Sequence, residues 1–452
     1  MVEKEILPQI RHLLKERKFD QIKSILNSLH PEDVASILDK IEKPALMLVL
    51  FRFLEPQKSI EVFEYLPHET QEKIIKSMPS EEVKKILDEM SPDERTALFE
   101  DMPAELVKKL LFLLSPQERQ TAIELLNFPE DSVGRLITPD FVQLQENWTV
   151  KEALEHIRRV GLEKETVYHC YVLDKDKRLI GLVSLKNLVL ASPTTKIKEI
   201  MNRDVIKVDA YTDKEEAAKI FKDYDLIALP VVDKENKLLG IITFDDFVDV
   251  LEEEATEDFE KFGAVLPVDK PYMEAGFFEI TWKRTFWLIV LLVLESFSGI
   301  VMQNYSSTIS KMIALTFFVP ILVATGGNAG TQSATLVIRG LATGELDSRD
   351  FFKIIFRESS MGFLIGLVLG FMGLLRAFMQ SKIWTISVAV GLGMCVTIVM
   401  ATTIGATLPL VFRRLRLDPA LMSSPLIATI VDIVGIGIYF QIATFTLNFL
   451  GR

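Results

Sequence analysis

Residues 320–335 read PILVATGGNAGTQSAT, and this stretch lies inside one of the long apolar runs that follow residue 275. A segment in hydrocarbon must satisfy its own backbone hydrogen bonds, so runs of about twenty apolar residues predict membrane-spanning helices. Five such helices are expected, at residues 282–304, 312–338, 354–378, 384–411 and 421–449. Residues 276–452 are therefore predicted to form an all-α membrane domain.

The same stretch carries polar residues and helix-disfavouring residues together. Pro320 and the pair Gly326 and Gly327 predict a break in the helix, which a membrane tolerates only beside water or protein. The neutral oxygens and amides that could hold a hydrated cation belong to Asn328, Thr331, Gln332, Ser333 and Thr335. A close contact between helices is the alternative, because small residues let backbones approach. That alternative explains the glycines but not Asn328 together with Gln332.

A second stretch, DPALMSSPLIATIVD at residues 418–432, ends on an acid inside the last predicted span. Burying the Asp432 carboxylate there costs on the order of 3 kcal/mol. No Lys or Arg lies within that span, so a cation from outside is the simplest partner. A protonated Asp432 bonded to a neighbouring helix is the alternative. We expect the Ala428 carbonyl, one turn earlier, to join the carboxylate, and Ser424 to line the same path; Glu295 is given no role.

Upstream of the membrane, residues 1–130 repeat a short unit about every twelve residues, seen in LPHETQ, MPSEEV, MSPDER, MPAELV and LSPQER. Pro suits the first position of a helix, so each unit predicts a helix start. Ser91 with Glu94 and Ser115 with Glu118 have the spacing of a capping box. The block is predicted to be a superhelix of short helices.

Residues 131–250 contain an internal duplication at a spacing of about sixty residues. YVLDKDKRLIGLVSLKNLV is echoed by PVVDKENKLLGIITFDDFV, and each copy predicts two strands joined by a polar turn and followed by a helix. This block resembles a tandem pair of CBS domains, at residues 131–194 and 195–250. The resemblance implies a regulatory module that binds an adenine nucleotide such as ATP. The nucleotide residues would be Asp246 in the second copy and Asn187, where the pattern has Asp, in the first.

A dense acidic run follows the second copy, in VDVLEEEATEDFEKFGAV, and residues 245–275 are predicted to form a connecting helix. Like charges three or four residues apart destabilise a helix by a few tenths of a kcal/mol per pair. A solvated linker helix is the alternative interpretation, because most charge runs are that.

The order of these blocks, with ATGGNAGTQSAT and DPALMSSPLIATIVD in the spans, resembles the MgtE family of magnesium transporters. The fold class expected is multidomain: an α superhelix, α/β CBS domains, an acidic plug helix and five transmembrane helices. The resemblance implies a homodimer in the bacterial inner membrane with cytoplasmic N-terminal domains, and a pore where Asp432 and Ala428 hold hydrated Mg²⁺. It also implies regulatory Mg²⁺ sites, which would involve Asp93, Glu215, Asp225, Asp246, Asp249, Glu254, Glu257 and Asp258.

Elementary electrostatics fits feedback control of such a pore. Facing carboxylates repel by about 4 kcal/mol per close pair at a surface-like dielectric, and Mg²⁺ that bridges them favours the compact, closed state. The net charge of −12 argues against nucleic acid as a partner. The sequence has only two cysteines, Cys170 and Cys395, which is too few for a disulfide framework. It contains no GxxxxGK[ST] motif, so an ATP-driven enzyme is not predicted. A transporter of Co²⁺ or Mn²⁺ and a nucleotide-sensing membrane receptor are the alternatives.

Overall fold

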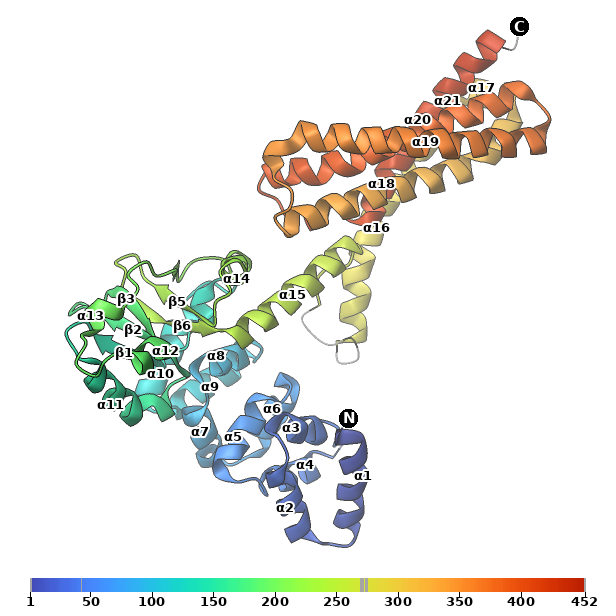
Figure 1. The fold of residues 1–452 in the computed structure, drawn as a ribbon. Helices are drawn as coiled ribbons and strands as arrows, with labels where there is room; N and C mark the ends of the chain where they lie inside the picture. Colours follow the sequence, from blue (N-terminus) through green and yellow to red (C-terminus); the bar gives the residue numbers. More distant parts are fainter. Residues whose placement is uncertain (1, 42, 269–271, 273–274, 451–452) are drawn as a thin grey trace. The chain divides into compact units, whose positions relative to one another are not determined.

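The computed structural model describes residues 2–41, 43–268, 272 and 275–450. The chain forms two compact units, residues 1–251 and residues 252–452, and each is described by itself (Figure 1). The predicted fold class is confirmed: an N-terminal helical region, two small α/β copies and five long apolar helices follow one another.

The N-terminal helices repeat with the period read in the sequence. They are α1 Val2–Lys15, α2 Phe19–Ser28, α3 Pro31–Asp39, α4 Pro44–Phe51, α5 Pro56–Glu64, α6 His68–Ser77, α7 Ser80–Glu89, α8 Pro92–Glu100, α9 Ala104–Leu113 and α10 Pro116–Leu126. From α6 to α10 a helix begins every 12 residues, at residues 68, 80, 92, 104 and 116. Their apolar faces share one core, which is why the short helices are stable together although each alone would be marginal.

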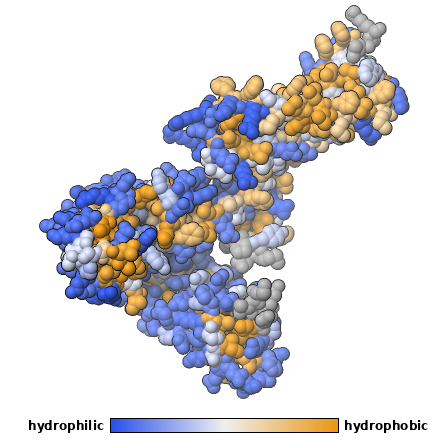
Figure 2. All heavy atoms as spheres, viewed as in Figure 1, coloured by the Kyte–Doolittle hydropathy of each residue, from blue (hydrophilic) through white to orange (hydrophobic). Residues whose placement is uncertain are grey.

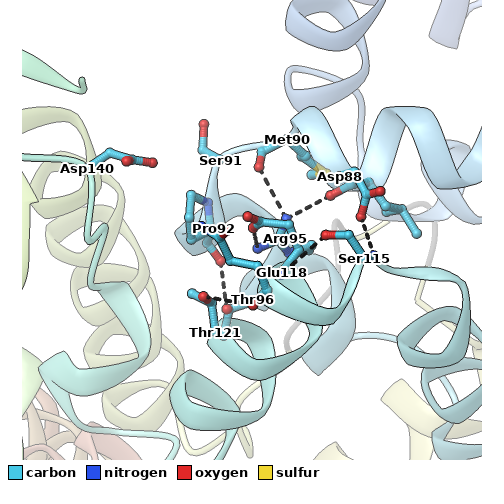
Figure 3. Close-up of polar contacts among 12 residues, drawn as sticks. Asp88, Met90, Ser91, Pro92, Arg95, Thr96, Ser115, Glu118, Thr121 and Asp140 are labelled. Atoms are coloured by element: carbon cyan, nitrogen blue, oxygen red, sulfur yellow. Dashed lines mark hydrogen bonds and ion pairs between the residues drawn. The ribbon is translucent and has the colours of Figure 1, made fainter. Parts of the chain in front are cut away.

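Polar side chains near the end of one helix cap the start of the third helix after it. Glu64 Oε1 accepts a hydrogen bond from the Ser91 backbone N–H at 2.8 Å. Asp88 Oδ1 accepts one from the Ser115 N–H at 2.8 Å (Figure 3). Orphan N–H groups of a helix start are thus satisfied from an earlier repeat, which links repeats of the superhelix that are not consecutive.

The predicted capping boxes are therefore wrong. Ser91 makes no side-chain cap and instead donates to Glu64. Ser115 does accept a hydrogen bond from the Glu118 N–H, at 3.4 Å. The Glu118 carboxylate, however, binds the fully buried Arg95 at 2.6 Å rather than its own helix start (Figure 3). A buried guanidinium needs a carboxylate more than a helix end does.

The duplicated block forms two small sheets of the same topology. The first contains β1 Phe141–Gln145, β2 Thr166–Leu173 and β3 Leu179–Ser184; the second contains β4 Val208–Asp209, β5 Ala228–Val232 and β6 Leu238–Thr243. In each, the first pair is parallel and the second antiparallel, with Val142 opposite Cys170 and Val208 opposite Val231. The flanking helices are η1 Val133–Leu136, α11 Val150–Val160, η2 Gly161–Glu163, α12 Leu185–Leu190, α13 Ile197–Ile200, α14 Lys214–Asp223 and α15 Phe244–Phe262.

The polar turns of the two copies are built alike. Asp174 Oδ1 accepts from the backbone N–H groups two and four residues on, and Asp233 Oδ1 does the same. Lys177 and Asn236 occupy the same left-handed conformation, with φ of 63° and 65°. Backbone bonds join the two turns, because Leu179 donates to Asn236 and Leu238 donates to Lys177. The two copies therefore form one body.

The membrane unit consists of long helices whose lipid-facing sides are apolar (Figure 2). They are α16 Phe277–Asn304, α17 Ser306–Lys311, η3 Ile313–Phe318, α18 Val319–Ala342, η4 Ser348–Asp350, α19 Phe351–Ser381, α20 Trp384–Arg414, η5 Pro419–Leu421 and α21 Ser424–Leu450. Five of these segments are long and apolar enough to span a bilayer, in agreement with the prediction. The connecting helix α15 ends at Phe262, well before residue 275; residues 269–271 and 273–274 of the predicted segment lie outside the described residues.

The predicted break in the second span is wrong, because α18 is one continuous helix. Pro320 lies in its first turn, where a missing N–H breaks no helix bond. The glycines serve packing: a Cβ on Gly330 would lie 3.0 Å from Val431 Cγ2 and 3.2 Å from the Ala401 carbonyl oxygen. The alternative of a small-residue contact therefore accounts for these glycines, while the helix still presents Asn328, Thr331 and Gln332 to one side.

Candidate functional site

A cavity of about 350 Å³ lies between α18 and α21. Its lining residues are Val323, Ala324, Gly327, Asn328, Thr331 and Gln332 from α18, and Ser424, Ala428 and Asp432 from α21. Two stretches about ninety residues apart in the sequence, each singled out for its polar residues, thus meet at one site. Thr335 is not among the lining residues; its hydroxyl donates to the Thr331 carbonyl at 2.8 Å.

Asp432 is the only acid of this cavity lining. Its Oδ1 is buried and has no hydrogen-bond partner in the part of the chain that the structure describes. Gly327 faces it: a Cβ there would lie 3.3 Å from Ala428 Cβ and 3.6 Å from Asp432 Oδ1. The glycine lets α18 and α21 approach while leaving space at the carboxylate. A hydrogen bond from a neighbouring helix, the alternative considered for this acid, is not made to Oδ1.

The groups around the carboxylate are neutral and polar. Asn328 and Gln332 supply amides, and the Ser424 hydroxyl lies 3.3 Å from the Thr331 hydroxyl. Mg²⁺ keeps most of its water and takes one or two carboxylates, so one acid among amides and hydroxyls can bind its hydrated form weakly. Weak binding suits passage, because an ion held tightly does not leave.

A second acidic site lies in the first unit, where α8 meets the start of α15. The Asp93 Oδ1 is buried without a hydrogen-bond partner among the described residues, and the Asp246 carboxylate lies close to it. Burial, with the charge of Asp246 nearby, raises the pKa of Asp93 well above its usual range. Burial also raises the pKa of Asp246 to about 6, although hydrogen bonds from the Thr243 N–H and hydroxyl lower it.

Two further acids join this pair: Glu94, for which the sequence predicts only a capping role, and Glu165, for which it predicts none. Burial, then the charges of Glu64 and Asp246, raises the pKa of Glu94 to about 7. Burial, then the charges of Asp245 and Asp246, raises the pKa of Glu165 to about 7. Glu165 lies about seventy residues from α8 in the sequence, so only the fold brings it here. We call Asp93, Glu94, Glu165 and Asp246 the cytoplasmic acid cluster.

Of the other expected regulatory residues, Asp249 lies near this cluster, whereas Glu215 and Asp225 belong to the region of α14. Glu215 is paired with Lys219 at 2.6 Å, and Asp225 is exposed just after α14 with a φ of 49°. Asp249 lies close enough to raise the pKa of Glu94 by its charge. Glu254, Glu257 and Asp258 lie on the later part of α15. Within the described ranges, no three His, Cys, Asp or Glu side chains are arranged to hold a metal ion.

Lys261, which the sequence analysis did not single out, links α15 to the segment before α21. Its Nζ lies 2.7 Å from Glu257 Oε1 and 2.8 Å from Asp418 Oδ2. Burial lowers the pKa of Lys261, but the hydrogen bonds and charges of Asp418 and Glu257 outweigh burial and raise it. The lysine stays charged and holds the connecting helix near the loop that leads to Ser424.

The expected nucleotide residues occupy matching places in the two CBS copies. The Asn187 side chain is exposed, and its backbone N–H donates to Ser184 Oγ at 3.2 Å, which caps α12. Asp246 follows Thr243 at the same strand-to-helix junction of the second copy. Its Oδ2 is already engaged by Thr243, so a ribose would have to share the carboxylate with the cytoplasmic acid cluster.

Comparison with known protein families finds three matches along the chain. Residues 29–131 match the MgtE intracellular N domain, and residues 133–193 and 197–253 each match the CBS domain. Residues 319–442 match the family described as a divalent cation transporter, MgtE. The cavity and the cytoplasmic acid cluster both lie within matched regions.

Curated relatives and solved structures agree with these matches. The chain is 43% identical to the magnesium transporter MgtE of Thermus thermophilus, over 72% of each chain. It is 35% identical to the magnesium transporter MgtE of Bacillus subtilis, over 71% of this chain and 70% of that one. A crystal structure of the cytosolic domain of the Mg²⁺ channel MgtE with ATP covers 54% of this chain and 99% of that one, with 35% identity and a TM-score of 0.51. The soluble part of a magnesium transporter covers 56% of this chain and 99% of that one, with 28% identity and a TM-score of 0.52.

Proposed function

This chain belongs to the MgtE family of magnesium transporters, and we propose that two copies form one pore that admits Mg²⁺ to the cytoplasm. It is a membrane protein with five spans and a cytoplasmic N-terminal region. The proposal keeps the domain limits 1–130, 131–194, 195–250, 245–275 and 276–452. Transport is passive in this account, since the membrane potential favours cation entry.

The observation that carries the proposal is the buried, unpartnered Oδ1 of Asp432 in a cavity of neutral polar groups. A carboxylate within a membrane span is costly unless a partner compensates it. A hydrated Mg²⁺ supplies that partner, with the Ala428 carbonyl and the Asn328 and Gln332 amides around its water shell. This cavity belongs to one copy of the chain. In the proposed dimer, a two-fold axis would bring the cavity of the second copy to face it, so that an Asp432 from each copy lies beside the ion.

The cytoplasmic acid cluster supports feedback by the transported ion. Its carboxylates come from α8, from the residue before β2 and from the start of α15. Burial raises their pKa values, and repulsion from neighbouring carboxylates raises them further. Mg²⁺ bound among them would draw these elements together. Because α15 is one helix that begins in the first unit and ends in the second, closing the cluster would move the plug helix and close the pore. The regulatory role of Glu215, Asp225, Asp249, Glu254, Glu257 and Asp258 belongs to the same proposal.

An adenine nucleotide is the further ligand proposed for the CBS pair. The support is the Thr243 and Asp246 junction, with Asn187 in the matching place, and a solved relative whose cytosolic domain holds ATP. A ribose hydroxyl bound at Asp246 would compete with Asp93 for that carboxylate. Nucleotide and Mg²⁺ would then influence each other's binding at one residue.

Uptake by the full chain in proteoliposomes tests the pore. We expect Asp432→Asn to lower Mg²⁺ uptake by about a hundredfold or more, because the amide keeps the shape and removes the charge. Glu345→Gln is the matched control, because Glu345 is an exposed acid outside the spans. Normal uptake by Asp432→Asn would contradict the proposal and favour a nucleotide-sensing receptor. Equal uptake of Co²⁺ or Mn²⁺ would favour a broader divalent cation pore.

A further inference from the structure

A second carboxyl group lies inside the membrane unit, outside the cavity. Glu358 of α19 is 8% exposed, although it stands within a membrane span between Arg357 and Ser359. A buried acid in a span is rare and has a functional role by default. The sequence places Glu358 inside the predicted third span, at residues 354–378.

Glu358 contacts the rear of the cavity-lining helix. Ser333 of α18 donates a hydrogen bond to Glu358 Oε2 at 2.7 Å, and its hydroxyl also lies 2.8 Å from the Thr402 carbonyl oxygen of α20. Ser333 is 3% exposed and Thr402 is 4% exposed. Ser333 directly follows Gln332, which lines the cavity. Since successive residues of a helix are about 100° apart, a group that holds Ser333 fixes the direction of Gln332.

Glycines bring the three helices together at this triad. Gly405, one turn after Thr402, touches the Gly330 carbonyl so closely that a Cβ would overlap it, and Gly330 is one turn before Ser333. Gly362, one turn after Glu358, lies against the Thr402 side chain, whose hydroxyl oxygen a Cβ would overlap. With backbones this close, the Glu358 side chain reaches α18 past α20. The triad thus joins α18, α19 and α20 at one level.

We infer that Glu358 is a positioning residue that sets the rotation of α18, and through it the selectivity of the cavity for Mg²⁺ over other divalent cations. The inference rests on the proposed pore. An amide such as Gln332 selects by the distance at which it meets the water shell of the ion. A small rotation of α18 changes that distance for Asn328 and Gln332 together, whereas Asp432 on α21 stays in place.

Hydrogen counting predicts which replacement is tolerated. The Ser333 hydroxyl has one hydrogen and two acceptors within reach, so it can donate to only one of them. A side chain at position 358 that donates a hydrogen to Ser333 frees the hydroxyl for the Thr402 carbonyl. Glutamine has the length of glutamate and donates through its amide. It should therefore preserve the triad, whereas methionine of similar length cannot.

The test is the ratio of Mg²⁺ to Co²⁺ uptake by full-length protein in proteoliposomes, normalised to protein that elutes as a single folded species. Glu358→Met should lower this ratio about tenfold, because an ångström of misplacement changes such rates strongly. Glu358→Gln should keep it within about twofold of wild type. Ser333→Ala should shift it in the same direction as Glu358→Met and keeps the fold testable if the methionine variant does not fold. Ser359→Ala is the control, since its hydroxyl meets Thr403 of α20 at 2.8 Å.

The outcomes separate this inference from the proposed pore. A merely structural role would lower uptake of both ions together and leave their ratio unchanged, which would overturn the inference. A glutamine variant with the methionine phenotype, or a Ser359→Ala variant with the same loss of selectivity, would overturn it as well. Wild-type protein that admits no Mg²⁺ would refute the proposed function instead. Wild-type uptake that Asp432→Asn abolishes, with an unaltered ratio in Ser333→Ala and Glu358→Met, would refute the inference alone.

Discussion

The membrane cavity and the cytoplasmic acid cluster both hold buried carboxyl groups, but they hold them differently. In the cavity one acid, Asp432, is surrounded by neutral groups and by helices packed through glycine. In the cluster several acids from separate elements face one another. One acid in a rigid frame can bind a passing ion and release it. Several acids that repel one another can instead act as a sensor. A bound cation removes their repulsion and so changes the positions of the elements that carry them.

The close packing of α18 and α20 is the first feature to test, because its loss should have a large effect on stability. A Cβ on Gly405 would overlap the Gly330 carbonyl, so Gly405→Ala should force α18 and α20 apart at a cost of about 3 kcal/mol. We expect a marked loss of folded protein, measured by thermal unfolding in detergent. Gly299→Ala is the matched control, because nothing lies within 4 Å of the added carbon. Equal stability of the two variants would show that close packing does not hold the cavity.

The next effect concerns the cluster. The double variant Asp93→Asn, Asp246→Asn removes the central pair of repelling charges, so Mg²⁺ has less to neutralise. The internal Mg²⁺ concentration that halves uptake should rise about tenfold, which corresponds to a loss of about 1.4 kcal/mol of coupling. Uptake at low internal Mg²⁺ should stay close to wild type. If internal Mg²⁺ inhibits uptake by the double variant as strongly as it inhibits wild type, the cluster has no regulatory role.

A third prediction uses the pH dependence of the cluster. The folded pKa of Glu94 is about 7, above its ordinary value of 4.5. The stability that its protonated form contributes is therefore full below about pH 4.5 and is lost as the pH rises through about 7. In metal-free buffer, the cytoplasmic fragment should melt about 5 °C lower at pH 8 than at pH 6. Corresponding parts of relatives have been solved on their own.

Two controls sharpen that measurement. Added Mg²⁺ should reduce the difference in melting temperature between pH 6 and pH 8, because the bound ion compensates the charge of the carboxylates at high pH. Glu94→Gln should flatten it without metal, because the amide does not titrate. A fragment that becomes more stable from pH 6 to pH 8 without metal would contradict the assigned repulsion.

The last prediction concerns Lys261, which follows the acid cluster in the sequence and precedes the residues of the cavity. Its replacement should have a small effect. Lys261→Met removes the ion pairs to Glu257 and Asp418, which are partly exposed and together stabilise by about 1 kcal/mol. Protease should cleave residues 252–268 several times faster in this variant. Lys237→Met, which removes an exposed pair with Glu235, is the control. Equal cleavage of both variants would show that Lys261 does not restrain α15.

The sequence allowed prediction of what depends on local pattern. The helical period of twelve residues, the duplicated strands and turns, the five spans and the isolated acid Asp432 all follow from spacing and composition, and the structure brings Asp432, Ala428, Ser424, Asn328 and Gln332 to one cavity. The predicted helix break at Pro320 was wrong. In sequence, a proline in the first turn and glycines at a helix contact cannot be distinguished from the proline and glycines of a broken helix.

What depends on distant contacts could not be read in the same way. Ser91 could not be distinguished from a helix cap, because its partner Glu64 comes from an earlier repeat. Glu94 and Glu165 meet only through the fold. Glu358 was within reach of sequence reasoning, since an acid inside a predicted span is itself a signal. Its partner Ser333, in contrast, required the packing of three helices.

Equilibrium binding of Mn²⁺ to the full chain, followed by electron paramagnetic resonance, tests most directly whether the two regions are separate cation sites. Wild-type protein should show two classes of site. Asp432→Asn should remove a weak class and leave the other, and the Asp93→Asn, Asp246→Asn variant should do the reverse. An Asp432→Asn isotherm identical to wild type, or one in which both classes vanish together, would contradict the account.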